Sequence, residues 1–173
     1  MLGEAATGLL FLWVYLQFGL SGQGIIGWVL VSLAVIVTVT DLKYMLIPNK
    51  VLLFFLPLLL LLVLVFPEGP IWSHLLGGVA GGGIMLLLAL FGGMGMGDMK
   101  LFALLGWVVG FPNVVLAFLI ACALGTVAGA TLMLLGKVKR GQRVPFGPWL
   151  AAGSLIAFSY GSHLISGYLA LIR

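Results

Sequence analysis

The sequence predicts an all-α polytopic membrane protein with about seven transmembrane helices, forming a single integral-membrane domain over residues 1–173. Apolar residues make up 63% of the chain and charged residues only 7%, against roughly 25% in ordinary soluble domains. Apolar stretches of spanning length recur from residue 4 to residue 172, so no polar segment is large enough for a domain outside the membrane. The 26 glycines favour closely packed membrane helices, and the alternating pattern of a barrel is absent from the sequence.

Charged and turn residues divide the apolar sequence into spans. In chain order the predicted spans are residues 4–20, 24–40, 51–66, 74–92, 98–111, 114–136 and 146–172. The first span makes about 26 Å of helix, just enough for a hydrocarbon core of about 30 Å. The fifth and sixth are separated because the 38 residues between Asp98 and Lys137 carry no charge and are too many for one crossing. Phe111, Pro112 and Asn113 supply the turn between them.

The basic residues set the orientation. In the seven-span arrangement one side of the membrane holds Lys43, Lys50, Lys100, Lys137, Lys139, Arg140 and Arg143. Only Arg173 falls on the other side, together with Glu68. Because cytoplasmic loops are enriched in Lys and Arg, we expect a cytoplasmic amino terminus and an outer carboxyl terminus. Membrane insertion and anionic headgroups account for the net charge of +4, so no nucleic-acid partner is expected.

Four acidic residues stand out, because an ionised side chain in the bilayer costs at least ~2.5 kcal/mol. Glu4 and Glu68 lie at or beyond span ends, where a charge at headgroup level explains them. Asp41 ends the second span and Asp98 begins the fifth, so both should reach the cytoplasmic face at one depth. Two such carboxylates can share a proton and a water, one acting as base and the other as acid on a carbonyl.

The alternative for each aspartate is an ion pair with a neighbouring lysine. Lys43 and Lys100 each follow an aspartate by two residues, which puts them on the wrong face of a helix for pairing. Glycine occupies every second position over residues 93–97, just before Asp98. This pattern predicts a flexible re-entrant segment where a substrate backbone can approach closely.

Other glycines and the histidines are expected to serve packing. Glycine pairs at four-residue spacing, which favour helix packing, are Gly78 with Gly82, Gly106 with Gly110, and Gly125 with Gly129. His74 and His163 have no metal-ligand spacing and are interpreted as packing or headgroup-level residues near the outer side. Cys122 is the sole cysteine, so the chain has no disulfide framework of its own.

Three blocks of sequence resemble a known family. They are DLK at 41–43 with IPN at 47–49, GMGDMKL at 95–101, and PFGP at 145–148. In this order they strongly resemble the bacterial type IV prepilin leader peptidases, polytopic aspartic proteases of the GxGD class, and the resemblance covers essentially the whole chain. A presenilin-like protease would carry a Pro-Ala-Leu block in a late span, which this sequence lacks.

The resemblance implies that Asp41 and Asp98 are the catalytic pair. They would activate a water that attacks the bond after the glycine ending the short basic leader of a prepilin or pseudopilin. It also implies a site on the cytoplasmic side of the bacterial inner membrane, with no cofactor and no metal. Gly95, Gly97 and Lys100 would form the active-site loop. Structural or substrate-path roles would fall to Lys43, Pro48, Asn49, Pro145, Phe146, Gly147 and Pro148.

Full-length bacterial members of this family carry a further region ahead of the part matched here. That region is a cytoplasmic domain with paired cysteines, which methylates the new amino terminus of the pilin. Residues 1–11 resemble the stretch that follows it, so neither methyltransferase activity nor its methyl donor is expected. The chain is interpreted as either a naturally short peptidase or an engineered fragment.

Two other classes of function stay open on the residues alone. A proton- or cation-coupled transporter would use paired aspartates to carry the ion, but would hold them near the midplane and show an internal repeat. A noncatalytic scaffold would explain the glycine faces, but gives the segment before Asp98 no purpose. The sequence does not determine whether the chain forms a homo-oligomer.

Substrate recognition is expected to depend on lipid and on apolar contact. The basic cytoplasmic face should not attract a basic leader strongly. We therefore expect the substrate's apolar helix to lie in a groove between spans, with anionic lipid holding the charges of the leader.

Overall fold

The computed structural model describes residues 2–91, 95–136 and 145–172, and all its regular structure over these ranges is helical. The helices are α1 (Leu2–Phe18), α2 (Gly22–Tyr44), α3 (Asn49–Val65), α4 (Ile71–Leu90), α5 (Met96–Val109), α6 (Asn113–Leu134) and α7 (Gly147–Ile172). Each begins and ends within four residues of a predicted span. The turn predicted at Pro112 separates α5 from α6, as expected.

Helix length and composition indicate a membrane protein. Among the described residues, α2, α4 and α6 are long and apolar enough to cross a bilayer, and α3 is a shorter apolar helix. Many large apolar side chains face outward, as lipid-facing positions would require, including Leu16, Leu53 and Val79.

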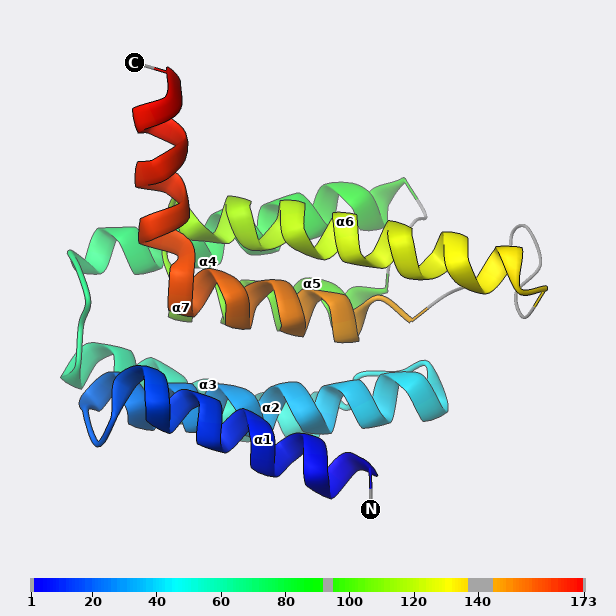
Figure 1. The fold of residues 1–173 in the computed structure, drawn as a ribbon, viewed down its shortest axis with the longest axis horizontal. Coiled ribbons are helices and arrows are strands. Elements are labelled where there is room, and N and C mark those ends of the chain that lie inside the picture. Colours follow the sequence, from blue (N-terminus) through cyan, green and yellow to red (C-terminus); the bar gives the residue numbers. More distant parts are fainter. Residues whose placement is uncertain (1, 92–94, 137–144, 173) are drawn as a thin grey trace.

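The helices form two layers. Figure 1 shows α1, α2 and α3 side by side in one layer and α4, α5, α6 and the first half of α7 in the other. The closest pairs are α4 with α5 and α6 with α7, and α2 packs on α7 across the layers. The second half of α7 turns away from the bundle (Figure 1), and its side chains are mostly exposed from Ser162 onward. Gly161 and Ser162 form a pair of the kind that permits a helix kink.

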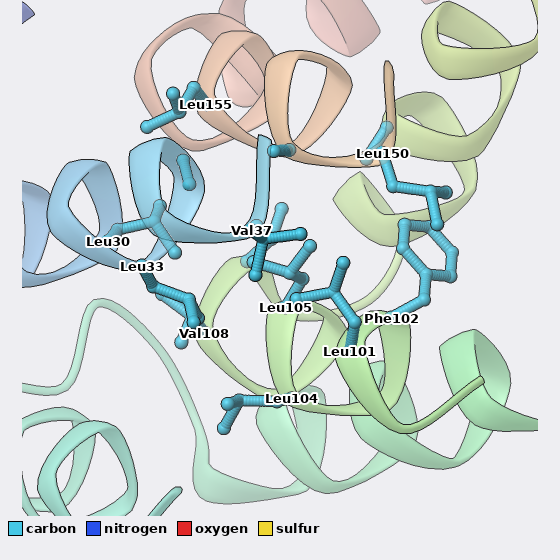
Figure 2. Close-up of a cluster of buried hydrophobic side chains, with 14 of the residues drawn as sticks. Leu30, Leu33, Val37, Leu101, Phe102, Leu104, Leu105, Val108, Leu150 and Leu155 are labelled. Carbon is cyan, nitrogen blue, oxygen red and sulfur yellow. The ribbon is translucent and has the colours of Figure 1, made fainter. Parts of the chain in front are cut away.

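The core lies where α2, α5 and α7 meet. Figure 2 shows its side chains interlocking between these helices, and the labelled residues are Leu30, Leu33, Val37, Leu101, Phe102, Leu104, Leu105, Val108, Leu150 and Leu155. Val37 precedes Asp41 by one turn of α2, and Leu101 follows Asp98 by one turn of α5. The two aspartates therefore lie at one end of the core, on helices that the core holds together.

Glycines bring α4 and α5 into backbone contact. A Cβ at Gly77 would meet the carbonyl oxygen of Gly106, and a Cβ at Gly106 would meet that of Gly77. At Gly81 it would lie 2.6 Å from the carbonyl oxygen of Phe102. This packing fixes the angle of α5, the helix that carries Asp98.

The glycine pairs named from spacing do not all lie at the closest contacts. Gly106 does, but on α4 the tightest positions are Gly77 and Gly81, one residue before the predicted pair Gly78 and Gly82. On α6, a Cβ at Gly129 would have nothing within 4 Å. Four-residue spacing identifies a glycine stripe, but it does not determine which of two adjacent stripes faces the neighbouring helix.

Gly77→Ala should destabilise the protein by about 1–3 kcal/mol, because the new methyl group collides with a backbone oxygen that cannot rotate away. Unfolding followed in a detergent titration measures the change. Gly83→Ala is the matched control on α4, since a Cβ there would have nothing within 4 Å. Equal stability of the two variants would show that the α4–α5 contact is looser than described.

Hydrogen bonds join the start of α4 to the residues that follow α5. Ser73 Oγ donates to the carbonyl oxygen of Phe111 at 2.7 Å, and the Phe111 N–H donates to that of Ser73 at 2.9 Å. His74 is buried, with Nδ1 2.9 Å from the carbonyl oxygen of Trp107. His74 is therefore a packing residue, one of the two roles that the sequence left open, and His163 is exposed on the second half of α7.

Candidate active site

Asp41 lies in the last turn of α2 and is almost completely buried, with 6% of its surface exposed. The helix ends just beyond it, because Met45 takes a left-handed conformation and donates its N–H to the Asp41 carbonyl oxygen at 2.8 Å. The Asp41 carboxylate accepts a hydrogen bond from the Gly147 N–H at 2.8 Å. Gly147 begins α7, where backbone amides lack a partner within the helix. The start of α7 thus supplies a donor to a buried carboxylate.

Asp98 lies in the first turn of α5, and its carboxylate accepts the Gly95 N–H at 3.2 Å. The prediction of a flexible re-entrant segment is wrong for Met96 and Gly97, which already belong to the helix. An acidic side chain at the third position of a helix can accept a hydrogen bond from the N–H of the residue just before the helix. Its negative charge also interacts favourably with the helix dipole. Asp98 thereby offsets the low helix propensity of Gly97. Residues 92–94, which include Gly93, lie outside the described residues.

The two aspartates line one cavity of about 330 Å³. Its walls are formed by Asp41, Met45, Leu46, Ile47, Asn49, Gly95, Met96, Gly97, Asp98 and Lys100. The charge of Asp41 acts on the Asp98 carboxyl group, so the two groups interact electrostatically. The structure therefore brings together, from the end of α2 and the start of α5, the two carboxylates that the sequence expected at one depth.

The IPN block connects these two helix ends. Lys100 Nζ donates to Asn49 Oδ1 at 3.1 Å, which joins α5 to the first residue of α3. A Cβ at Gly97 would lie 3.1 Å from the Ile47 Cβ, so the α5 start packs closely on the segment between α2 and α3. Pro48 is the N-cap of α3, a position that suits its fixed backbone angle. Of these residues, Ile47, Asn49, Gly97 and Lys100 line the cavity.

The remaining predicted residues divide between the cavity and its surroundings. Gly147 contacts Asp41, and Phe146 packs on α6, where a Cβ at Gly125 would lie 3.0 Å from its ring. Pro148 lines an apolar groove between α1, α2 and α7, away from the dyad cavity, and Pro145 directly precedes Phe146 and is half-buried. Lys43 is exposed, with Nζ 5.4 Å from the ring centroid of Tyr44, and lies outside the cavity.

Sequence reasoning missed two features of the site. The apolar walls formed by Met45, Leu46 and Met96 were not predicted, although Met96 lies inside the 95–101 block and the other two lie between DLK and IPN. The direct bond from Gly147 to Asp41 was missed as well, because no spacing rule relates residues 106 positions apart. In the described ranges, no three His, Cys, Asp or Glu side chains cluster so as to hold a metal ion.

The dyad lies within a region shared with known proteins. Residues 28–130 match the type IV leader peptidase family. The prepilin leader peptidase/N-methyltransferase of Bacillus subtilis is 39% identical over 170 residues, covering 97% of this chain and 68% of that protein. The protein of the same name from Stutzerimonas stutzeri is 31% identical over 184 residues, covering 98% of this chain and 61% of its own length.

A third relative extends the same similarity. The prepilin leader peptidase/N-methyltransferase of Aeromonas salmonicida is 34% identical over 157 residues, covering 84% of this chain but 51% of its own length. The chain thus spans about half to two thirds of the length of these relatives. No solved structure gives a significant match. The family match, the extended similarity to these relatives and the position of both aspartates within residues 28–130 lead to one conclusion: the chain belongs to the type IV leader peptidase family.

Proposed function

We propose that this chain is a membrane-embedded aspartic endopeptidase that removes the leader from type IV prepilins or pseudopilins. The observation that carries the proposal is the shared cavity of Asp41 and Asp98. Membership of the leader peptidase family supports the substrate class, because relatives along nearly the whole chain are named prepilin leader peptidases. The proposal does not include methyl transfer, although those relatives are also named N-methyltransferases.

The proposed chemistry divides the work between the two carboxyl groups. The ionised carboxylate takes a proton from a water, which attacks the scissile carbonyl, while the protonated carboxyl donates its proton to the carbonyl oxygen. The proton taken from the water then passes to the leaving amine as the C–N bond breaks, and a hydroxyl of the tetrahedral intermediate returns its proton to the other carboxylate. The Gly147 N–H stabilises the ionised form of Asp41, and the Gly95 N–H does the same for Asp98. Both groups can therefore carry the negative charge in turn.

The proposal includes seven spans with the dyad at the cytoplasmic face. Three observations support this arrangement. Seven helices coincide with the predicted spans, and both aspartates lie at helix ends. Lys43 and Lys100 lie at those same two ends, and Lys50 lies at the start of α3. The other basic residues of this face, over 137–143, and Arg173 lie outside the described residues. A cytoplasmic dyad in the bacterial inner membrane would meet a leader before the pilin is exported.

The ion-coupled transporter has no support. Asp41 is in the last turn of α2 and Asp98 in the first turn of α5, whereas a carrier holds its acids near the bilayer midplane. The relatives reported above are peptidases by name.

Cleavage of a prepilin by the purified chain in lipid tests the proposed function. We expect two products, whose masses place the cut directly after the glycine that ends the leader, and no methylated product is needed for that result. A matched prepilin with this glycine replaced should stay intact. A folded chain that leaves several prepilins uncut, or that conducts protons across vesicles instead, would overturn the proposal.

Cysteine labelling from the two sides of the membrane tests the orientation. In a Cys122→Ser background, Lys43→Cys should react with an impermeant maleimide only from the cytoplasmic side, and Glu68→Cys only from the outside, because an odd number of spans separates them. Labelling of both positions from one side would contradict the proposed topology. Cleavage activity of each variant confirms that the labelled protein is folded.

A further inference from the structure

A second groove adjoins the dyad cavity, between α3 and α5. It has a volume of about 420 Å³ and is lined by Asn49, Lys50, Leu52, Leu53, Leu56, Lys100 and Leu104. Its polar residues come from the starts of the two helices, so they gather at one end. Leu53 and Leu56 lie about 4.5 Å and about 9 Å along α3 from Lys50. The groove therefore has a cationic end and an apolar wall about two turns long.

No acidic side chain in the described part of the chain forms an ion pair with the two lysines at this end. Lys50 has no ion pair there, and the polar contact of Lys100 is with the neutral Asn49 amide oxygen at 3.1 Å. Two lysines that line one groove without an ion pair favour the binding of an anion there. Leu53, with 73% of its surface exposed, shows that the apolar part of the groove opens outward, toward lipid in the proposed arrangement.

We propose that this α3–α5 groove binds one anionic phospholipid of the leaflet that surrounds the dyad. The phosphate would lie between Lys50 and Lys100, and an acyl chain would cover Leu53, Leu56 and Leu104. The apolar helix of a substrate could cover the leucines, but it would leave both lysines unneutralised. The basic leader of a substrate would be repelled by them. An amphiphile with an anionic head satisfies both ends of the groove.

The bound lipid would have a role at the active site. This inference rests on the proposed function, because Asn49 and Lys100 line both the groove and the dyad cavity. A phosphate at this position would stand at the margin of the cavity, where a basic leader would otherwise meet an excess of positive charge. The negative charge of the lipid would thereby reduce the repulsion between this margin and the basic leader.

Native mass spectrometry of the purified chain with equal phosphatidylglycerol and phosphatidylcholine tests the site without any prepilin. The parent should retain phosphatidylglycerol in preference to phosphatidylcholine. Lys50→Gln should lower the apparent affinity for phosphatidylglycerol about fivefold, the contribution of one lysine near an anionic surface. Lys43→Gln makes the same change of net charge outside the groove and should leave binding unchanged. Leu53→Trp, which keeps both lysines and fills the apolar part, should also weaken binding.

Several results would overturn the inference. Equal losses in Lys50→Gln and Lys43→Gln would indicate a diffuse surface charge, and equal binding of both lipids would exclude an anion site. Glycerol phosphate competing as well as the whole lipid would indicate a headgroup site with no acyl-chain contact. Displacement of the lipid by an uncleaved prepilin would assign the groove to substrate. Since binding is read without cleavage, an inactive parent that keeps its phosphatidylglycerol would overturn the proposed function and leave the lipid site standing.

Discussion

Asp41→Asn and Asp98→Asn should each lower the rate of prepilin cleavage by about 10²–10⁴-fold or more, the range that general acid–base groups contribute. Each amide removes the proton exchange on which the proposed mechanism depends. Each also keeps the shape of the side chain and an oxygen that can accept the bond now made to the backbone, from Gly147 or from Gly95. The loss of activity should therefore come without a loss of fold, as single-turnover rates and thermal melts of the same preparations would show.

The control for these variants is Glu68, the acidic residue that the proposed topology places on the opposite side of the membrane. Glu68→Gln makes the same chemical change in the loop between α3 and α4, and it should cleave prepilin at the parent rate. Cleavage at more than a tenth of the parent rate in either aspartate variant would refute a two-aspartate mechanism. A large loss in Glu68→Gln would instead indicate that a general effect of charge on insertion or folding lies behind all three results.

The position of each helix was predictable because charged residues and prolines are scarce in this chain. Asp41, Asp98 and Pro112 mark boundaries of the predicted spans, and the observed helices begin or end within four residues of each. The common depth expected for the two aspartates followed from the same reasoning, since helix ends on one side of a membrane share a depth. Depth alone did not establish that they line one cavity, because that depends on how α2 packs against α5 and α7.

What the sequence could not predict is lateral packing. The face of α4 that meets α5 is centred on Gly77 and Gly81, and the neighbouring stripe of Gly78 and Gly82 has the same spacing and composition. The helical state of Gly97 was mispredicted for a related reason. A glycine pattern gives the low helix propensity of a segment, but the bond from the Gly95 N–H to the carboxylate, which stabilises the helix start, depends on three-dimensional geometry.

Gly147→Ala should lower kcat for prepilin cleavage by about 10²-fold and change KM much less. A Cβ at Gly147 would lie 2.7 Å from Asp41 Oδ2 and 3.2 Å from Val37 Cγ1, so the carboxylate or the start of α7 must move. Movement of the carboxylate lengthens its 2.8 Å bond to the Gly147 N–H and displaces the reacting oxygens from their present position in the cavity shared with Asp98. A misplacement of about 1 Å is enough for a loss of this size. Substrate binding through apolar helix contacts would be little affected.

Two variants separate this effect from a general disturbance of α7. Gly167→Ala changes the same helix at a position where a Cβ would have nothing within 4 Å, and it should keep the parent kcat. The double variant Val37→Ala/Gly147→Ala removes the contact with Val37 and retains the one with Asp41, so its kcat should stay as low as that of Gly147→Ala. If the double variant instead recovered the rate of Val37→Ala alone, packing against Val37 would be the cause, and Gly147 would not position Asp41. The experiment thus distinguishes a glycine required by the carboxylate from one required by the core, since both contacts arise from the same Cβ.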